Sequence, residues 1–350
     1  MGARKRKSLD SLPNDQQDHT EKRMLVDRRK FCKSAVALGL LPGLARGQSQ
    51  GQQRVEPRGS EGIRARKITA RGLIFDALET GSGGEPVLLL HGFPETSLMW
   101  TGLMPVLSAN GYHCLAPDQR GYSPGARPPK VDDYRYEELV ADALAFGREL
   151  GGRFHLIGHD WGANVGWLTL ATDPSSIASF TAISIPHYAA WSRSVYDDEK
   201  MAGYRSMLET WMTEGKGEAS WSPELLRRIW KAKPADQTEK LIAKMTEPGA
   251  MTAALNWYRA SRGHKRVLED FTIPKVNVPT LLIFGRSDIG QRSVADAASL
   301  MTGSYRVVQP DGGHFIVDEQ PKIVAEETLA HLRAHPIKQL PSIASSEKDK

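Results

Sequence analysis

From about residue 62 the chain alternates apolar, strand-like runs with helix-like segments, and this alternation predicts an α/β fold built on a mostly parallel sheet. The helix-like segments carry apolar residues every three to four positions, as in residues 136–150. We expect helices on both faces of the sheet. The clearest strand-like runs are residues 87–90, 113–116, 154–157, 180–185, 281–284 and 305–308.

The alternation is interrupted between residues 187 and 271, where no apolar strand-like run occurs. This segment is rich in Trp and Met and is broken by glycines and prolines, which predicts short helices. Ligands of open α/β sheets bind beyond the carboxyl ends of the strands, so a helical insertion after strand six would cover a site there as a cap. The expected layout is a core of residues 62–186 and 272–335, a cap of residues 187–271 and a disordered tail of residues 336–350.

Residues 1–47 have the features of a leader rather than of a folded domain. The segment Asp-Arg-Arg-Lys-Phe-Cys-Lys at 27–33 precedes a mild apolar run at 35–44 and then a polar stretch, an order that resembles a bacterial twin-arginine export signal. The run is shorter than the roughly 20 apolar residues that span a bilayer. The resemblance implies a periplasmic or secreted protein without stable membrane anchoring. The alternative is a disordered basic tail beside a small amphipathic helix.

The basic charge of the chain belongs to this leader. The formal net charge is +5, and residues 1–45 hold ten of the 46 Lys and Arg residues but five of the 41 Asp and Glu residues. The remainder has 36 of each sign and gives no reason to expect nucleic acid or an anionic membrane surface as a partner. Because Cys32 lies in the leader, a processed chain keeps only Cys114, which we expect in the core, and forms no internal disulfide.

Residues 154–163 have the pattern of a strand, a tight turn and a helix, with Asp160 at the centre of the turn. Glycine at 158 and 162 permits a turn that strains the central residue and brings strand and helix close together. Asp160 would then lie at a helix N-terminus, whose partial positive charge favours an ionised carboxylate. Taken alone, the pattern also fits an ordinary turn in which Asp160 caps the helix.

Further motifs resemble the epoxide hydrolase and haloalkane dehalogenase branch of the α/β-hydrolases over residues 62–335, and they occur in the same order as in that family. The resemblance implies the α/β-hydrolase fold, with a mostly parallel sheet of eight strands. The segment His-Gly-Phe-Pro at 91–94 is similar to the family's oxyanion-hole motif. The resemblance implies that the amides of Phe93 and Trp161 face developing negative charge. The segment Asp-Gln-Arg-Gly-Tyr-Ser at 118–123 is similar to a family segment that we interpret as structural.

Asp288 and His314 complete the triad that the resemblance implies. Each lies just past a strand, so nucleophile, acid and histidine follow the hydrolase order. In the family mechanism Asp160 attacks a substrate carbon, and His314 with Asp288 behind it then deprotonates a water that cleaves the ester. Taken singly, Asp288 could cap a helix from Ser293, and a histidine in a glycine-rich loop could be a surface residue. We expect His159 to pack or hydrogen-bond rather than to react.

The cap carries a similarity to the segment in which epoxide hydrolases place one of two acid tyrosines. Residues 255–259 match that segment, and Tyr258 falls on the tyrosine that donates to the epoxide oxygen; the alternative is a plain core aromatic. The second tyrosine is expected in a helix over residues 197–210, where this chain has Met207 instead. Tyr204, one helical turn earlier, could substitute for it.

Three functions remain open from the sequence. The first is an epoxide hydrolase that forms a vicinal diol through an alkyl ester on Asp160, with a small hydrophobic epoxide or related substrate and no metal or organic cofactor. The second is a haloalkane or haloacid dehalogenase, although haloalkane dehalogenases usually have Asn at the position of Phe93, and the fluoroacetate type has Arg at that of Trp161. The third is a non-catalytic binding protein, which an intact triad opposes. A homodimer is left open.

Overall fold

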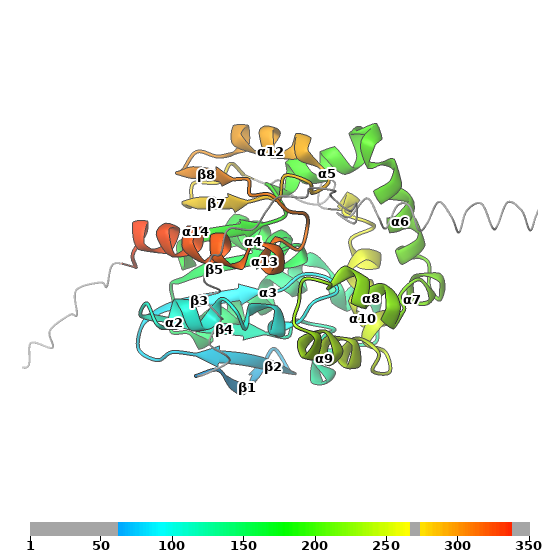
Figure 1. The fold of residues 1–350 in the computed structure, drawn as a ribbon, viewed down its shortest axis with the longest axis horizontal. Helices are drawn as coiled ribbons and strands as arrows, with labels where there is room; N and C mark the ends of the chain where they lie inside the picture. The colour runs from blue at the N-terminus through cyan, green and yellow to red at the C-terminus, as the bar shows by residue number, and fades with distance from the viewer. Residues whose placement is uncertain (1–61, 267–273, 338–350) are drawn as a thin grey trace, which may run out of the picture.

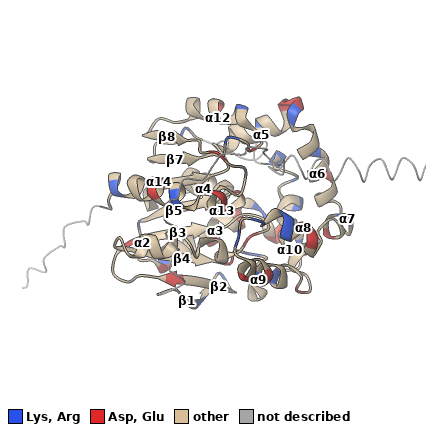
Figure 2. Cartoon of the chain, viewed as in Figure 1, with Lys and Arg blue, Asp and Glu red and all other residues tan. Residues whose placement is uncertain are grey.

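The computed structural model describes residues 62–266 and 274–337. The predicted leader, with the segment that resembles an export signal, lies outside the described residues, as does most of the tail expected after residue 335. Among the residues that are described, no helix is both long and apolar enough to cross a membrane. Positive and negative side chains are interspersed over the described elements in the view of Figure 2.

Eight strands form one sheet in the order β1-β2-β4-β3-β5-β6-β7-β8 (Figure 1). β2 pairs antiparallel with β1 and with β4, and every other neighbouring pair is parallel. The predicted mostly parallel, eight-stranded sheet is therefore confirmed. The strands are β1 (Arg64–Ala70), β2 (Leu73–Thr80), β3 (Glu85–Leu90), β4 (Tyr112–Pro117), β5 (Phe154–His159), β6 (Ile177–Ile183), β7 (Thr280–Ile283) and β8 (Tyr305–Val308).

Helices occupy both faces and one end of the sheet. Those of the core are α2 (Met104–Ser108), α3 (Tyr136–Glu149), α4 (Trp161–Thr172), α12 (Gln291–Ala297), α13 (Ile316–Glu319) and α14 (Pro321–Ala334). Those inserted between β6 and β7 are α5 (Tyr188–Asp197), α6 (Ala202–Met212), α7 (Lys216–Ala219), α8 (Pro223–Ile229), α9 (Ala235–Met245) and α10 (Ala250–Ala260).

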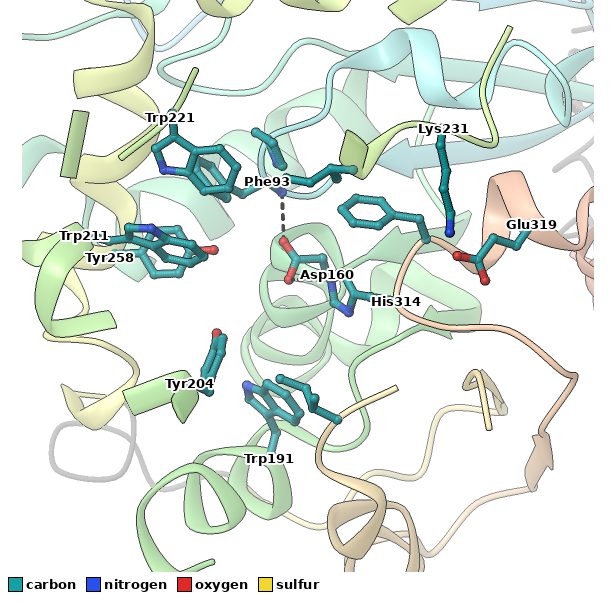
Figure 3. A pocket seen from close by; sticks show the side chains of 14 residues that line it. Phe93, Asp160, Trp191, Tyr204, Trp211, Trp221, Lys231, Tyr258, His314 and Glu319 are labelled. Carbon is teal, nitrogen blue, oxygen red and sulfur yellow. Dashed lines mark hydrogen bonds and ion pairs between the residues drawn. The ribbon is translucent and has the colours of Figure 1, made fainter. Parts of the chain in front are cut away.

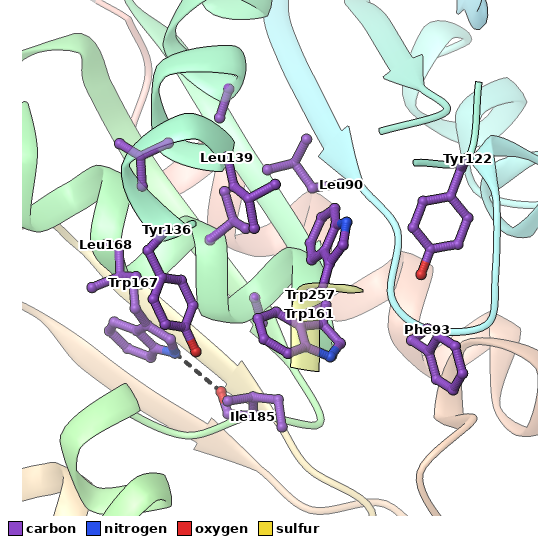
Figure 4. Packing of buried hydrophobic residues seen from close by; sticks show 14 of the residues in the cluster. Leu90, Phe93, Tyr122, Tyr136, Leu139, Trp161, Trp167, Leu168, Ile185 and Trp257 are labelled. Atoms are coloured by element: carbon purple, nitrogen blue, oxygen red, sulfur yellow. Dashed lines mark hydrogen bonds between the residues drawn. The ribbon is translucent and has the colours of Figure 1, made fainter. Parts of the chain in front are cut away.

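Alternation along the central strands divides the core into two layers. In β3 the side chains of Leu88 and Leu90 pack on one face with α3, α4 and the cap, as Figure 4 shows around Leu90 and Leu139. Those of Val87 and Leu89 point to the other face and pack with α2 and α14. Because successive residues of a strand face opposite ways, a strand that is apolar throughout must be covered on both sides. Cys114 is buried in this second layer, as expected.

The helical insertion lies at the end of the sheet where the parallel strands finish (Figure 1). The described inserted helices fall within the segment predicted as a cap. One helix prediction was wrong: residues 197–210 do not form a single helix, because α5 ends at Asp197 and Asp198 is extended, with φ −93° and ψ 119°. The Asp198 carboxylate accepts a hydrogen bond from the amide of Lys200 and so begins a new turn.

The strand register gathers the loops that follow the strands at one edge. Leu90 of β3 is level with Gly158 of β5, and Ile283 of β7 is level with both Ile183 of β6 and Val308 of β8. The residues that follow these positions therefore emerge side by side, beneath the inserted helices. All three residues of the predicted triad lie in these loops.

Candidate active site

Asp160 occupies a strained turn between β5 and α4. Its backbone has φ 50° and ψ −116°, a region that non-glycine residues seldom adopt. A Cβ atom on Gly158 would lie 2.4 Å from the carbonyl oxygen of Gly162, and one on Gly162 would lie 2.0 Å from the carbonyl oxygen of Leu90. The turn thus requires glycine at both positions, as the sequence predicted, and it packs against β3 as well as against its own strand.

The two carboxylate oxygens of Asp160 have different partners. Oδ1 accepts a 2.8 Å hydrogen bond from the amide of Phe93, drawn as a dashed line in Figure 3, and Oδ2 lies 3.3 Å from Nε2 of His314. Trp161 begins α4, so no preceding helical carbonyl accepts from its amide. Burial would raise the pKa of Asp160, but the hydrogen bond and positive charge of His314 hold it below its usual value. The carboxylate is ionised and buried.

His314 is held by carboxylates at both ring nitrogens. Nδ1 lies 3.1 Å from Oδ2 of Asp288, whose Oδ1 accepts a 2.8 Å hydrogen bond from the amide of Ile289. Burial opposes protonation of this imidazole, but the charges of Asp288 and Asp160 and the hydrogen bonds to them raise its pKa to about 10. The free site therefore contains a positively charged His314 between two carboxylates.

Two buried polar side chains fix the backbone of His314. The carbonyl oxygen of His314 accepts hydrogen bonds from Nε2 of His159 at 2.8 Å and from Oγ of Ser184 at 2.7 Å. Burial and the charge of His314 lower the pKa of His159 to about 3, so its ring is neutral and can act as this donor. His159 hydrogen-bonds, as expected from the sequence. Ser184 was not identified there, because its role depends on tertiary contact with a residue 130 positions away.

Asp288 does not cap the helix that follows it. α12 begins at Gln291 after Gly290, and the loop of Asp288 instead hydrogen-bonds along the loop that leads to His314. The amide and hydroxyl of Ser287 both donate to the carbonyl oxygen of Gly312, at 2.9 and 2.7 Å. This pairing places the acid and the histidine at a fixed separation.

A cavity opens directly over Asp160 between the sheet and the inserted helices (Figure 3). Its lining is mainly aromatic and aliphatic, which suits an apolar ligand. The Asp160 carboxylate, the His314 ring and the hydroxyl groups of Tyr204 and Tyr258 supply polar groups. Two charged residues, Lys231 and Glu319, lie at one side of the cavity. The lining residues are Phe93, Pro94, Asp160, Trp191, Tyr204, Trp211, Trp221, Ile229, Lys231, Tyr258, Ile289, His314, Phe315 and Glu319.

Tyr258 and Tyr204 both reach this cavity from the inserted helices. Figure 3 shows their hydroxyl groups pointing into the space beside Asp160, Tyr258 from α10 and Tyr204 from α6. Burial, and next the charge of Asp160, raise the pKa of each phenol well above its usual value, so both remain protonated donors. Met207, on the same helix as Tyr204, is buried but is not among the described residues that line the cavity. Of the two positions considered for a second tyrosine, only Tyr204 faces Asp160.

The segment at residues 118–123 joins the core to the inserted helices. The carboxylate of Asp118 accepts from the amide of Ser97 at 2.8 Å and pairs with Lys244 of α9. The guanidinium of Arg120 forms two hydrogen bonds to Asp142, at 2.7 and 2.9 Å. The backbone carbonyl oxygen of Arg120 accepts a hydrogen bond from the indole of Trp257. These contacts support the structural interpretation of this segment.

Sequence reasoning missed a buried charged cluster beside the oxyanion-type loop. Nζ of Lys233 lies 3.2 Å from the carboxylate of Glu95 and 2.6 Å from that of Asp318. Lys233 comes from the loop between α8 and α9, whereas the two acids belong to the core. Glu95 directly follows the His-Gly-Phe-Pro motif, and this position was the feature of the sequence from which the cluster could have been identified. Within the described part of the chain, no group of three His, Cys, Asp or Glu residues is arranged to hold a metal ion.

Comparison with known proteins agrees with this fold. The profile of a family described as alpha/beta hydrolase fold matches residues 85–209. Epoxide hydrolase A of Mycobacterium tuberculosis is 28% identical, over 76% of this chain and 96% of that protein. The AB hydrolase superfamily protein YfhM of Bacillus subtilis is also 28% identical, over 78% of this chain and 99% of its own length. A crystal structure of epoxide hydrolase A from Mycobacterium thermoresistibile superposes with a TM-score of 0.69 at 25% identity, over 79% of this chain and 100% of that one.

The fold, the order of the residues at the strand ends and these similarities define the class. The chain is a hydrolase with the α/β-hydrolase fold. Among proteins of this fold it is similar to epoxide hydrolases, at 25–28% identity over more than three quarters of the chain.

Proposed function

We propose that the protein converts an apolar epoxide to a vicinal diol through a covalent ester on Asp160. The observation that carries the proposal is the position of two protonated phenols, Tyr258 and Tyr204, across one cavity from an ionised Asp160 carboxylate. Opening an epoxide requires a nucleophile at carbon and a proton donor at oxygen, on opposite sides of the bond that breaks. The relatives named above as epoxide hydrolases support the same reading.

In the first step Oδ2 of Asp160 attacks an epoxide carbon. Oδ1 is engaged by the Phe93 amide, so Oδ2 is the oxygen that forms the new C–O bond. As the epoxide C–O bond breaks, its oxygen takes a proton from a tyrosine. A carboxylate suits this role because the resulting ester has a carbonyl that water can attack, whereas a serine would leave an ether.

Formation of the ester changes the charge balance around His314. The Asp160 charge that contributes to its raised pKa disappears, so the imidazolium loses its proton, which restores the tyrosine that gave one up. Neutral His314, oriented by Asp288, then deprotonates water for attack on the ester carbonyl. The developing oxyanion at Oδ1 accepts hydrogen bonds from the amide of Phe93 and, we propose, from the amide of Trp161. Collapse releases the diol and regenerates Asp160.

Two features favour an epoxide over a carbon–halogen bond. A halide cradle would need the Trp161 indole to reach the leaving group, but Trp161 is absent from the described lining of the cavity, and the ring of Tyr258 packs on it at 5.0 Å between centroids. The position at which haloalkane dehalogenases usually carry Asn is Phe93, which has no side-chain donor. A non-catalytic binding protein would have no need of a strained nucleophile turn beside a charged histidine and acid.

The test is turnover of a panel of aryl and alkyl epoxides and haloalkanes by the protein without its leader, followed by diol and halide analysis. We expect diol from styrene oxide or a similar apolar epoxide, and no diol from an Asp160→Ala variant that remains folded. Halide release without diol would favour the dehalogenase alternative. Binding of these compounds without any product would favour the non-catalytic alternative.

A further inference from the structure

The buried imidazole of His264 lies beside the hydroxyl group of Tyr204. The residue follows α10 in a turn, its side chain is buried, and Nε2 lies 3.3 Å from the hydroxyl oxygen of Tyr204. The two rings are nearly parallel, with 15° between their planes. Nδ1 lies 3.4 Å from the hydroxyl of Tyr188, which also contacts the hydroxyl of Tyr136. One imidazole thus joins a cavity phenol to a pair of buried phenols.

The surrounding structure fixes the orientation of this ring. The backbone amide of His264 donates to Oγ of Ser261 at 3.3 Å. His264 has a φ of 77°, a value that residues other than glycine rarely adopt. The ring also packs against the indole of Trp161, with 5.0 Å between centroids. An unfavourable backbone conformation at a buried polar residue indicates that the fold is held to this placement by other contacts.

His264 is neutral in the folded protein. Burial lowers its pKa to about 4, and the charge of Asp160 offsets only part of that effect. A neutral imidazole has one N–H donor and one bare nitrogen, so between two hydroxyl groups it donates to one and accepts from the other. The choice decides whether the proton of Tyr204 points at His264 or remains available to the cavity.

An epoxide oxygen can only accept a hydrogen bond, so Tyr204 must direct its own proton to the substrate. We propose that His264 is a positioning residue for Tyr204, with Nε2–H donating to the phenol oxygen while Nδ1 accepts from Tyr188. This inference rests on the proposed function, since it assigns His264 a part in epoxide opening. Tyr204 lies one helical turn before Met207, the position at which the family pattern places the second tyrosine.

The arrangement assists the alkylation step. As the epoxide C–O bond breaks, the alkoxide oxygen takes the Tyr204 proton, and the electron pair of the broken O–H bond stays on the phenolate. That negative charge develops next to the Nε2–H of His264, whose hydrogen bond strengthens because its acceptor is now charged. The proton that His314 then releases restores the phenol. His264 itself keeps its protons.

The first test is a double-mutant cycle between His264→Phe and Tyr204→Phe in a His314→Gln background, where alkylation of Asp160 is followed by mass spectrometry. We expect His264→Phe to slow alkylation by roughly 10- to 100-fold, as loss of a hydrogen bond to a charged group implies. In the Tyr204→Phe background the same change should have almost no effect. His264→Gln, which keeps an N–H donor, should restore part of the rate.

Tyr196→Phe is the matched control, since it removes a hydrogen bond from the Tyr196 hydroxyl to the carbonyl oxygen of Gly263 in the same turn. It should leave the alkylation rate near that of the parent. If Tyr196→Phe slowed alkylation as much as His264→Phe does, His264 would have only a structural role. The same would follow if the slowing in the double variant of His264→Phe and Tyr204→Phe equalled the product of the two single effects.

The second test needs no turnover. ¹⁵N NMR of the ring nitrogens, with phenylacetamide present so that its carbonyl oxygen stands for the epoxide oxygen, should show the Nε2–H tautomer of His264. The Nδ1–H tautomer would overturn the proposal even if the enzyme opens epoxides. If the His314→Gln parent forms no adduct with an epoxide panel and the wild type forms no diol, the proposed function fails instead, and the role of His264 in epoxide opening fails with it.

Discussion

Nε2 of His314 lies 3.3 Å from Oδ2 of Asp160, so the candidate base is paired with the candidate nucleophile before any substrate binds. This contact protects the carboxylate from protonation and keeps the imidazole charged. Once Oδ2 is esterified, the contact no longer joins two charges. In the proposed mechanism, His314 is therefore released as a base only after the ester on Asp160 has formed.

Asp288 should govern the second half of the reaction through the pKa of His314. Burial alone would lower that pKa, and the charge of Asp288 is the largest of the contributions that bring it to about 10. We expect Asp288→Asn to lower the His314 pKa, measured by NMR, and to reduce kcat by roughly 10²- to 10⁴-fold. The alkyl-enzyme should accumulate in this variant. A variant that instead slows alkylation and leaves ester hydrolysis unchanged would contradict the assigned order.

The two cavity tyrosines should act on alkylation rather than on ester hydrolysis. Tyr258→Phe and Tyr204→Phe should each lower the rate of alkylation by roughly 10- to 100-fold, because one phenol then polarises the epoxide oxygen alone. Rapid-mixing measurements that separate the two half-reactions provide the readout. Met207→Leu, on the same helix as Tyr204, is the control and should remain close to the wild type. A large loss in Met207→Leu with none in Tyr204→Phe would reverse the assignment.

The cluster of Glu95, Lys233 and Asp318 should make stability depend on pH. Burial, with a smaller contribution from the charge of Asp318, raises the pKa of Glu95 to about 7, although Lys233 opposes this. When the pKa of a carboxyl is higher in the folded protein than in the unfolded chain, its protonated form stabilises the fold. This contribution is complete at pH values below the unfolded-state pKa and is lost as the pH rises through the folded-state pKa. The free energy of unfolding of the wild type, relative to Glu95→Gln, should fall on the order of 2 kcal/mol between pH 4.5 and 7.

This difference is measured by urea unfolding of both proteins across that pH range. Titrating groups distant from Glu95 change in parallel in the two proteins, so the comparison isolates the cluster of Glu95, Lys233 and Asp318. A difference that stays constant, or that grows with pH, would show that the Glu95 carboxyl is not held in its neutral form.

Gly162 should tolerate no side chain. A methyl group there would meet the carbonyl oxygen of Leu90 at 2.0 Å, and backbone on both sides must move to relieve the contact. We expect Gly162→Ala to destabilise the protein by about 3 kcal/mol or more, or to prevent folding. Gly102→Ala is the control, because a methyl group at that position would have no neighbouring atom within 4 Å, and the stability of this variant should barely change. Equal melting temperatures for the two variants would count against the close packing of the turn.

Export can be tested separately, since we propose that the leader is a twin-arginine signal and that the protein is periplasmic or secreted. Replacing Arg28 and Arg29 by Lys should leave the full chain in the cytoplasm, because the arginine pair is the feature on which the resemblance depends. Cell fractionation gives the answer, with Lys30→Arg as a charge-neutral control. Unchanged delivery of the double variant to the periplasm would remove the twin-arginine reading.

Local patterns predicted six of the eight strands, β3 to β8, and the family resemblance added the eight-stranded sheet and the triad roles of Asp160, Asp288 and His314. The turn around Asp160 could be recognised within ten residues of sequence, although its packing against Leu90 of β3 could not. Parallel pairing then brings Asp288 and His314 to the same edge. β1, at the edge of the sheet, and β2 beside it were not among the runs that we identified, because they carry many exposed or half-buried residues, including Arg64 and Lys67 of β1.

The inserted helices were less predictable in detail. Tyr204 and Met207 are three residues apart on one helix, and only the packing of that helix over the sheet decides which of them faces Asp160. Lys233 and His264 lie in irregular segments, where no hydrophobic period indicates orientation. Their importance depends on partners distant in sequence, Glu95 for the lysine and Tyr204 for the histidine.

The central claim is that Asp160 forms a covalent ester with its substrate. The most direct measurement is mass spectrometry of peptides from a His314→Gln variant after incubation with an epoxide that the wild type converts to a diol. We predict an increase in mass equal to that of the epoxide on the peptide that contains Asp160, and no such increase in Asp160→Ala/His314→Gln. An adduct on another residue, or no adduct with an epoxide that the wild type turns over, would contradict the account.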